Sequence, residues 1–291
     1  MTSRLRAAGC VFAEDEARIL LDAAATPAEL AEMVRSRAQG HPLEHVVGRA
    51  EFGGLRISVD AGVFVPRRRS EFLVETALGR TPAHAVVVDL CCGSGALAAA
   101  LAAGAGHPVE VYAADIDPAA VRCARRNLAA VEGQVFEGDL FQPLPAALRG
   151  RVDVLLANVP YVPTADIALL PAEARIHEAR PALDGGADGL DVLRRVAEEA
   201  PRWLAPGGAL FFETSERQVP EALAVVGAAG LTGAVSSCPD RDATAVTATR
   251  PRRPWSAGVP ETRPQAPRPA PRNSDCLAAP GMVEYPHECG S

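Results

Sequence analysis

Residues 86–97 have the sequence Val-Val-Val-Asp-Leu-Cys-Cys-Gly-Ser-Gly-Ala-Leu, and they carry the strongest sequence signal for the fold class. The continuous apolar run Val86–Val88 is typical of a strand that is buried on both faces of a parallel sheet. A short loop with Gly93 and Gly95 follows, and the alanine-rich sequence from Ala96 predicts a helix. Glycines let the backbone approach a ligand closely, and a helix N-terminus offers unpaired N–H groups. The stretch therefore predicts a strand, a loop and a helix built around a bound ligand.

The chain beyond this unit repeats the pattern of strand, turn and helix. Strands are predicted at residues 109–114, 134–137, 152–157, 209–213 and 243–249, and helices at 96–103, 118–131 and 220–229. This alternation predicts an α/β fold with a doubly wound, Rossmann-like sheet, in which ligands bind at the carboxyl ends of the strands. The glycine loop alone suits NAD, FAD or S-adenosylmethionine, and a purely structural tight turn is the alternative.

Acidic residues follow two of the later strands. Asp115 ends the second strand about twenty residues past the loop, where a carboxylate can accept both hydroxyls of a ribose. Asp139, followed by Leu140, ends the third strand, where an acid can bind an adenine amino group. Enzymes that use NAD share the first of these acids, so the pair favours a nucleotide-like cofactor without selecting one.

The sequence after the fourth strand selects the chemistry. Asn158-Val159-Pro160-Tyr161 is expected at the carboxyl edge of the sheet, beside the glycine loop. It resembles the Asn-Pro-Pro-Tyr methyltransferases, which methylate planar amide or amino nitrogens. The lone pair of such a nitrogen is delocalised, so two acceptors aimed at its N–H groups, the Asn158 oxygen and the carbonyl of residue 159, can localise it. Tyr161 can pack against the planar substrate group.

Further segments resemble the protein-(glutamine-N5) methyltransferases of the HemK/PrmC type. Residues 42–52 and 63–67 are similar to the linker hairpin of that family, with Val65-Pro66-Arg67 at a segment close to the cofactor, and residues 176–190 are similar to its later Gly-Gly-x-Asp-Gly segment. The resemblance implies a class I methyltransferase sheet and S-adenosyl-L-methionine as cofactor. It also implies a protein partner that carries an exposed glutamine, for which a peptide-chain release factor is the candidate.

The patterns and the resemblance together predict four parts of the chain. These are an N-terminal helical substrate-docking domain (1–42), a β-hairpin linker (43–66), the methyltransferase domain (67–249) and a disordered tail (250–291). The tail holds 9 of the 25 prolines, and its six Arg against four acids give it a net charge of +2.

The resemblance also assigns site residues. The expected cofactor-binding residues are Asp89, Cys91, Cys92, Gly93, Ser94, Gly95, Asp115, Asp139, Leu140 and Asn158. The expected catalytic residues are Asn158, Pro160 and Tyr161, and the acceptor is expected to bind at Asn158, Val159, Pro160 and Tyr161. No metal site is expected, because the seven cysteines form no C-x-x-C pair. Arg67–Arg69 is interpreted as a solvated turn, with docking of an acidic partner or ribosomal RNA as the alternative.

Two departures from the family motif bear on the activity. Val159 stands where the family has Pro, and Cys91-Cys92 replaces a Gly-Thr-type pair. A Cβ at position 91 restricts the approach of the backbone to a ligand. These departures indicate a paralogous branch and leave its protein target open.

Composition weighs against nucleic acid as the substrate. All 29 basic residues are Arg, the 36 acidic residues give a net charge of −7, and the body before residue 250 is more acidic still. Such a body lacks the cations that neutralise phosphates, so direct nucleic-acid binding is disfavoured. The alternatives are an N6-adenine nucleic-acid methyltransferase and a non-catalytic cofactor-binding paralogue. With no targeting signal and no membrane-spanning stretch evident, the expected location is cytoplasmic.

Overall fold

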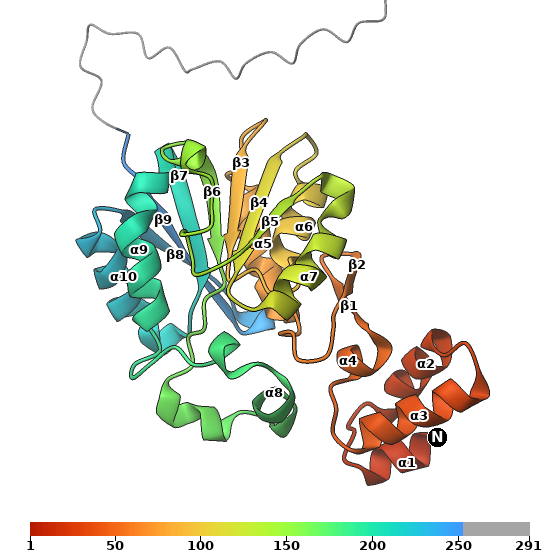
Figure 1. Cartoon of the computed structure of the whole chain (residues 1–291). Coiled ribbons are helices and arrows are strands. Elements are labelled where there is room, and N and C mark those ends of the chain that lie inside the picture. The colour runs from red at the N-terminus through yellow and green to blue at the C-terminus, as the bar shows by residue number, and fades with distance from the viewer. Residues whose placement is uncertain (253–291) are drawn as a thin grey trace, which may run out of the picture. The chain divides into compact units, whose positions relative to one another are not determined.

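The computed structural model describes residues 1–252, and residues 253–291 lie outside the described part. A seven-stranded sheet forms its centre, with the strands in the order β5 (Gln134–Glu137), β4 (Glu110–Asp115), β3 (Val86–Leu90), β6 (Val152–Ala157), β7 (Leu204–Glu213), β9 (Ala243–Thr249) and β8 (Thr232–Cys238) (Figure 1). The first five of these strands pair in parallel, and β9 runs antiparallel to both of its neighbours. The prediction of a doubly wound α/β sheet is confirmed.

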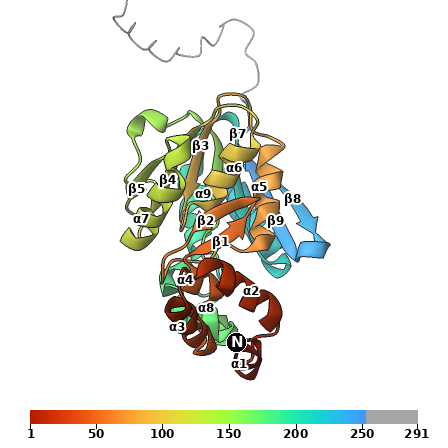
Figure 2. The ribbon, with the colours of Figure 1, turned by 90° about the vertical axis from the view of Figure 1, so that its right-hand side faces the viewer.

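Helices cover both faces of this sheet (Figures 1 and 2). One face is covered by α5 (Glu71–Leu78), α6 (Ala96–Gly104) and α7 (Pro118–Asn127), and the other by α9 (Asp191–Trp203) and α10 (Val219–Ala228). Val87 packs into the core on the first face, whereas Val86 and Val88 pack into the core on the second. Successive side chains of a strand point to opposite faces, so a strand covered on both sides is apolar throughout.

Several elements differ from the sequence prediction. α7 ends at Asn127 and a 3-10 turn over Ala129–Val131 follows, although the sequence predicts one helix to residue 131. β7 begins at Leu204, five residues before the strand that the sequence predicts at 209–213. The pattern does not reveal α5, α9 or β8. α9 contains Pro201, and β8 is a largely exposed edge strand whose extended geometry comes from its pairing with β9.

Four helices precede the hairpin: α1 (Thr2–Ala7), α2 (Ala13–Ala23), α3 (Pro27–Ala38) and α4 (Leu43–Val47). The first three enclose a small core of their own, which contains Leu5, Cys10, Ala13, Ala17, Leu20 and Val34. α3 begins at Pro27, because the Thr26 Oγ1 atom accepts a hydrogen bond from the Glu29 N–H at 3.1 Å and caps the helix.

The structure corrects the extent of the hairpin linker. Residues 43–66 are expected to form the linker hairpin, yet α4 occupies the first five of them. Gly48 then adopts a left-handed φ of 73° and ends that helix. The hairpin itself consists of β1 (Arg49–Phe52) and β2 (Leu55–Ser58), which are joined by a turn at Gly53-Gly54.

A buried arginine joins the N-terminal helices to a distant segment. Arg37 on α3 is 8% exposed. Its Nε donates to Glu16 Oε2 at 2.7 Å, and its NH1 group donates to Glu173 Oε1 at 2.6 Å. Glu173 lies on α8 (Ala172–His177), between β6 and α9. The arginine therefore ties the N-terminal bundle to the loop region that follows β6.

The described chain continues past the predicted end of the catalytic domain. The Arg250 N–H donates to the Gly208 carbonyl at 2.9 Å, and the Gly207 N–H donates to the Arg250 carbonyl at 3.0 Å. Arg250 therefore belongs to the folded body and not to the predicted tail, and the remainder of that predicted tail from residue 253 lies outside the described residues. Among the helices of residues 1–252, none combines the length and the apolar character that crossing a membrane requires.

Replacing Arg37 by Met should lower the free energy of unfolding by about 3 kcal/mol, because it leaves the largely buried Glu16 carboxylate without its partner. Urea unfolding followed by circular dichroism measures the change. The matched control is Arg35→Met, since the Arg35–Glu32 pair lies at the surface with both side chains more than half exposed. We expect it to cost less than about 0.5 kcal/mol. Equal effects of the two substitutions would contradict the stabilising role of the buried Arg37–Glu16 pair.

Candidate functional site

A cavity of about 620 Å³ opens at the carboxyl ends of β3, β4 and β6. It is of the size that small-ligand sites in proteins have. The glycine loop after β3 lines one part of it, and the loop after β6 lines another. The cavity lies where a doubly wound sheet is expected to bind its ligand. Of the site residues expected from the sequence, it is lined by Cys91, Cys92, Gly93, Ser94, Asp115, Asn158, Val159, Pro160 and Tyr161.

The glycine loop is held against Asp115. The Gly93 N–H donates to Asp115 Oδ2 at 2.8 Å, and the Asp117 N–H donates to Asp115 Oδ1 at 2.9 Å. Burial raises the pKa of the Asp115 carboxyl, while these backbone donors oppose that shift. Each carboxylate oxygen keeps a further lone pair. The side chain can therefore accept hydrogen bonds from a ligand while it holds the loop.

Two backbone positions make the loop compact. Gly95 has a φ of 76°, and a Cβ added there would lie 3.2 Å from the Ala124 Cβ, so α6 and α7 pack closely at this point. Cys91 has a φ of 53°, in the left-handed region that favours glycine. Since the sequence places a cysteine there, the loop carries backbone strain beside the cavity.

Four expected cofactor-binding residues lie outside the cavity lining: Gly95, which packs against α7, and Asp89, Asp139 and Leu140. Asp89 is fully buried; one of its oxygens accepts from the Ala98 N–H at 3.3 Å, and Oδ1 has no hydrogen-bond partner among the described residues. Burial raises the pKa of Asp89 to about 8. Asp139 is paired with Arg195 of α9 at 2.5 Å, and Leu140 packs against the core on that face.

The loop after β6 is backed by a cluster of polar side chains. Tyr161 OH donates to Glu213 Oε1 at 2.6 Å, and the Ser70 hydroxyl donates to Glu213 Oε2 at 2.6 Å. Arg69 donates to the same carboxylate through Nε at 2.8 Å, and its NH2 group donates to the phenol oxygen of Tyr161 at 2.6 Å. Asn158 Nδ2 lies 3.4 Å from the Ser70 oxygen. One buried carboxylate, that of Glu213, thus links the turn before α5 to the loop after β6.

The solvated-turn interpretation of Arg67–Arg69 is wrong for two of the three arginines. Arg67 donates to both oxygens of Glu178, at 2.6 and 2.7 Å, and Glu178 is 6% exposed. Arg69 pairs with Glu213, and only Arg68 carries no interaction of this kind within the described residues. Arg67 and Arg69, which both line the cavity, are therefore each paired with a buried glutamate of opposite charge.

Comparison with known proteins agrees with this geometry. Residues 54–188 match the family model of the methyltransferase small domain. The release factor glutamine methyltransferase of Geobacter sulfurreducens is 41% identical over 209 residues, which are 70% of this chain and 72% of that protein. The enzyme of the same name from Deinococcus radiodurans is 36% identical over 251 residues, or 79% of this chain and 88% of that one. The chain belongs to the release factor glutamine methyltransferase family.

It is therefore an enzyme of the S-adenosylmethionine-dependent protein-glutamine methyltransferase class, and the family resemblance of the sequence is confirmed. A methyltransferase structure from Pyrococcus furiosus superposes with a TM-score of 0.52 at 17% identity, covering 68% of this chain and 90% of that chain. At this level of identity the likeness concerns the fold alone.

The cavity of the methyltransferase fits S-adenosylmethionine. Asp115 presents a carboxylate at the position where ribose hydroxyls are bound in such folds. A Cβ added at Gly93 would meet no protein atom within 4 Å, so there is open space beside the loop. Within residues 1–252, no group of His, Cys, Asp and Glu side chains is arranged to hold a metal ion.

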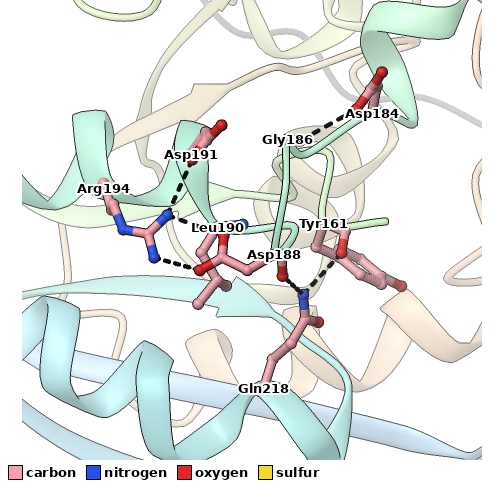
Figure 3. A network of polar contacts seen from close by, with 8 residues as sticks. All are labelled: Tyr161, Asp184, Gly186, Asp188, Leu190, Asp191, Arg194 and Gln218. Carbon is pink, nitrogen blue, oxygen red and sulfur yellow. Dashed lines mark hydrogen bonds and ion pairs between the residues drawn. The ribbon is translucent and has the colours of Figure 1, made fainter. Parts of the chain in front are cut away.

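A second network supports the Asn158–Tyr161 loop of the methyltransferase from behind (Figure 3). Gln218 Nε2 donates to the Tyr161 carbonyl and to the Asp188 carbonyl, both at 2.9 Å. A Cβ at Gly189 would lie 2.2 Å from the backbone carbonyl oxygen of Tyr161, and one at Gly185 would lie 2.6 Å from that of Pro160. The Gly-Gly-x-Asp-Gly segment needs its glycines because it packs directly against the main chain of that loop.

Sequence reasoning missed Ser70, Arg69, Glu178, Glu213 and Gln218 as members of the site. Only Glu213 carried a usable signal, because it ends the predicted strand 209–213 at the edge of the sheet where ligands bind. The others lie in turns whose partners are distant in sequence, so no local pattern marks them.

Replacing Gln218 by Leu should lower kcat at least about tenfold, because two hydrogen bonds that hold the loop are lost. Cofactor affinity should stay unchanged, since Gln218 does not line the cavity. Steady-state kinetics and calorimetry measure the two quantities. Gln134→Leu on the exposed face of β5 is the control and should leave both unchanged. A normal kcat for Gln218→Leu would show that these two hydrogen bonds are not needed to hold the loop.

Replacing Cys91 by Gly should raise the free energy of unfolding by about 0.5–1 kcal/mol, because relief of the left-handed strain exceeds the extra entropy cost of glycine. The control is Cys92→Gly, which removes a thiol that is 6% exposed and packed in the core, and should destabilise the protein. Thermal unfolding of the two variants should shift in opposite directions. A lower midpoint for Cys91→Gly would refute the strain argument.

Proposed function

We propose that this methyltransferase transfers the methyl group of S-adenosylmethionine to the side-chain amide nitrogen, N5, of a glutamine in a peptide-chain release factor. The observation that carries the proposal is the placement of Asn158 in one cavity with the glycine loop and Asp115. The names of its relatives, release factor glutamine methyltransferases, point to the same acceptor. Because such an acceptor works on ribosomes, we also propose a cytoplasmic location.

The cofactor side of the cavity is proposed to consist of the glycine loop and Asp115. Asp115 would accept hydrogen bonds from the ribose hydroxyls, and Gly93 and Ser94 would let the backbone approach the ligand. The bound cofactor supplies an electrophilic methyl group on a sulfonium. Asp139, which is paired with Arg195, is proposed to reach the adenine only after that ion pair rearranges.

The acceptor side is proposed to be the loop after β6. The Asn158 Oδ1 atom and the Val159 carbonyl accept no hydrogen bond from the described residues. Both are thus available to the two N–H groups of a glutamine amide, whose lone pair they would localise. Pro160 shapes the wall, and the Tyr161 ring would pack against the planar amide.

Two further features support the proposal: one concerns the charge of the acceptor, and the other the rigidity of the loop. Beside the Asn158–Tyr161 loop, the pairs Arg67–Glu178 and Arg69–Glu213 leave neither the arginines nor the glutamates with an uncompensated charge that would attract a carboxylate or an ammonium. Val159, which replaces the family's proline, is 2% exposed and packs in the core. This packing holds the loop main chain without a proline, which argues against the non-catalytic alternative.

A protein partner is further supported by the N-terminal bundle, which we propose as the docking domain. Val11 and Phe12, between α1 and α2, are 83% and 69% exposed. Apolar side chains that protrude side by side from a small helical domain are typical of surfaces that bind other proteins.

Replacing Asn158 by Ala should reduce methylation at least about 100-fold, because one of the two acceptors that activate the amide is lost. Purified enzyme, cofactor and release factor are incubated, and the mass gain of one methylene group on glutamine is followed by mass spectrometry. Calorimetry should find cofactor binding close to that of the wild type.

Three outcomes would contradict the proposal. If wild-type enzyme binds the cofactor but methylates no release factor, the release factor is not the methyl acceptor. Methylation of adenine that survives protease treatment would assign the activity to nucleic acid. Full activity of Asn158→Ala would show that Asn158 is not catalytic.

A further inference from the structure

Glu213 is a buried hydrogen-bond acceptor behind the catalytic loop. It ends β7, is 4% exposed, and receives hydrogen bonds from Ser70, Tyr161 and Arg69. An ionised carboxylate has no proton to donate, so all three partners must point a hydrogen at it. The carboxylate therefore determines where the hydroxyl protons of Ser70 and Tyr161 lie.

The orientation of the Ser70 hydroxyl in turn fixes which group of the Asn158 amide faces Ser70. A serine hydroxyl has one hydrogen, and that of Ser70 is directed to Glu213 at 2.6 Å. Toward Asn158, 3.4 Å away, the Ser70 oxygen can only accept. The group of Asn158 that faces Ser70 must then be its NH2, and the carbonyl oxygen Oδ1 must point elsewhere. Among residues 1–252, no protein donor is bonded to that oxygen.

The orientation of this amide decides whether the site can accept a glutamine. With Oδ1 toward the acceptor, Asn158 receives a hydrogen bond from the glutamine NH2 group. With the amide turned over, its own NH2 would meet the substrate NH2, and two donors would face each other without an acceptor. An asparagine carries both groups on one side chain, so a neighbour must select between them.

We propose that Ser70 and Glu213 are positioning residues that hold the Asn158 amide with its oxygen toward the acceptor nitrogen. The proposal rests on the proposed function, in which Asn158 accepts from the glutamine amide. It adds residues 70 and 213, which both line the cavity, to the reaction as groups that act through Asn158. Ser70 is 3% exposed, so bulk water does not compete for its hydrogen.

The same carboxylate orients Tyr161. The phenol donates to Glu213 and accepts from Arg69, so its oxygen is held from two sides. Burial raises the pKa of Tyr161, which keeps the phenol protonated and able to donate. Both side chains that would contact the glutamine amide thus take their orientation from Glu213.

Kinetics of Ser70→Ala, Ser70→Thr and Glu213→Gln test the proposal. Ser70→Ala and Glu213→Gln should each lower kcat about 10- to 100-fold with the KM for the release factor within about twofold, because the acceptor still binds but meets a wrongly oriented amide. Ser70→Thr keeps the hydroxyl and should retain kcat within about threefold. The control Thr247→Val removes a buried hydroxyl on β9, outside the cavity, and should leave kcat unchanged.

A double-mutant cycle separates positioning from general destabilisation. Adding Ser70→Ala to Asn158→Ala should cause no further loss of kcat, since Ser70 acts through an amide that is already absent. Multiplicative losses would overturn the proposal, as would wild-type kcat in Ser70→Ala or failure of Ser70→Thr to retain activity. If Ser70→Ala does not fold, Ser70→Thr and Glu213→Gln decide the question. Wild-type enzyme that fails to methylate release factor would instead contradict the proposed function.

Discussion

The parallel pairing of β3 with β4 on one side and β6 on the other is the constraint on which the site depends. Leu90 is level with Ala114 of β4 and with Ala157 of β6. The residues that follow these three, Cys91, Asp115 and Asn158, therefore emerge together at one edge of the sheet. A change of register in either ladder would separate the glycine loop from the Asn158–Tyr161 loop, whatever residues those loops contained.

Buried carboxylates then organise what the sheet has brought together. Glu213 and Glu178 are almost completely buried, and each is paired with an arginine from the turn before α5. A buried charge is costly unless it is paired and hydrogen-bonded, so these glutamates hold their partners in defined positions. Arg37 forms a similar buried pairing between the N-terminal bundle and Glu173 of α8, which lines the cavity. Rigid positioning of this kind is what methyl transfer to a weak nucleophile requires.

Asp139 shows that a motif predicts the position of a residue along the chain but not the partner of its side chain. The sequence places it at the end of a strand, and the family resemblance assigns it to the adenine. In the structure it lies two residues after the end of β5. Arg195, which is 56 residues away in the chain, pairs with its carboxylate. The position of a strand end follows from local periodicity, whereas the partner of a charged side chain depends on which helix packs beside it.

The sequence alone predicts six of the seven strands of the sheet, the glycine loop, and the positions of Asp115 and the Asn158–Tyr161 loop after their strands. Each of these is a contiguous pattern, because periodicity and turn chemistry act over a few residues. Only the tertiary structure decided that Ser70 and Glu213, 143 residues apart in the chain, share a hydrogen bond behind Asn158. No local pattern encodes such a contact, since it arises from the packing of the turn before α5 against the end of β7.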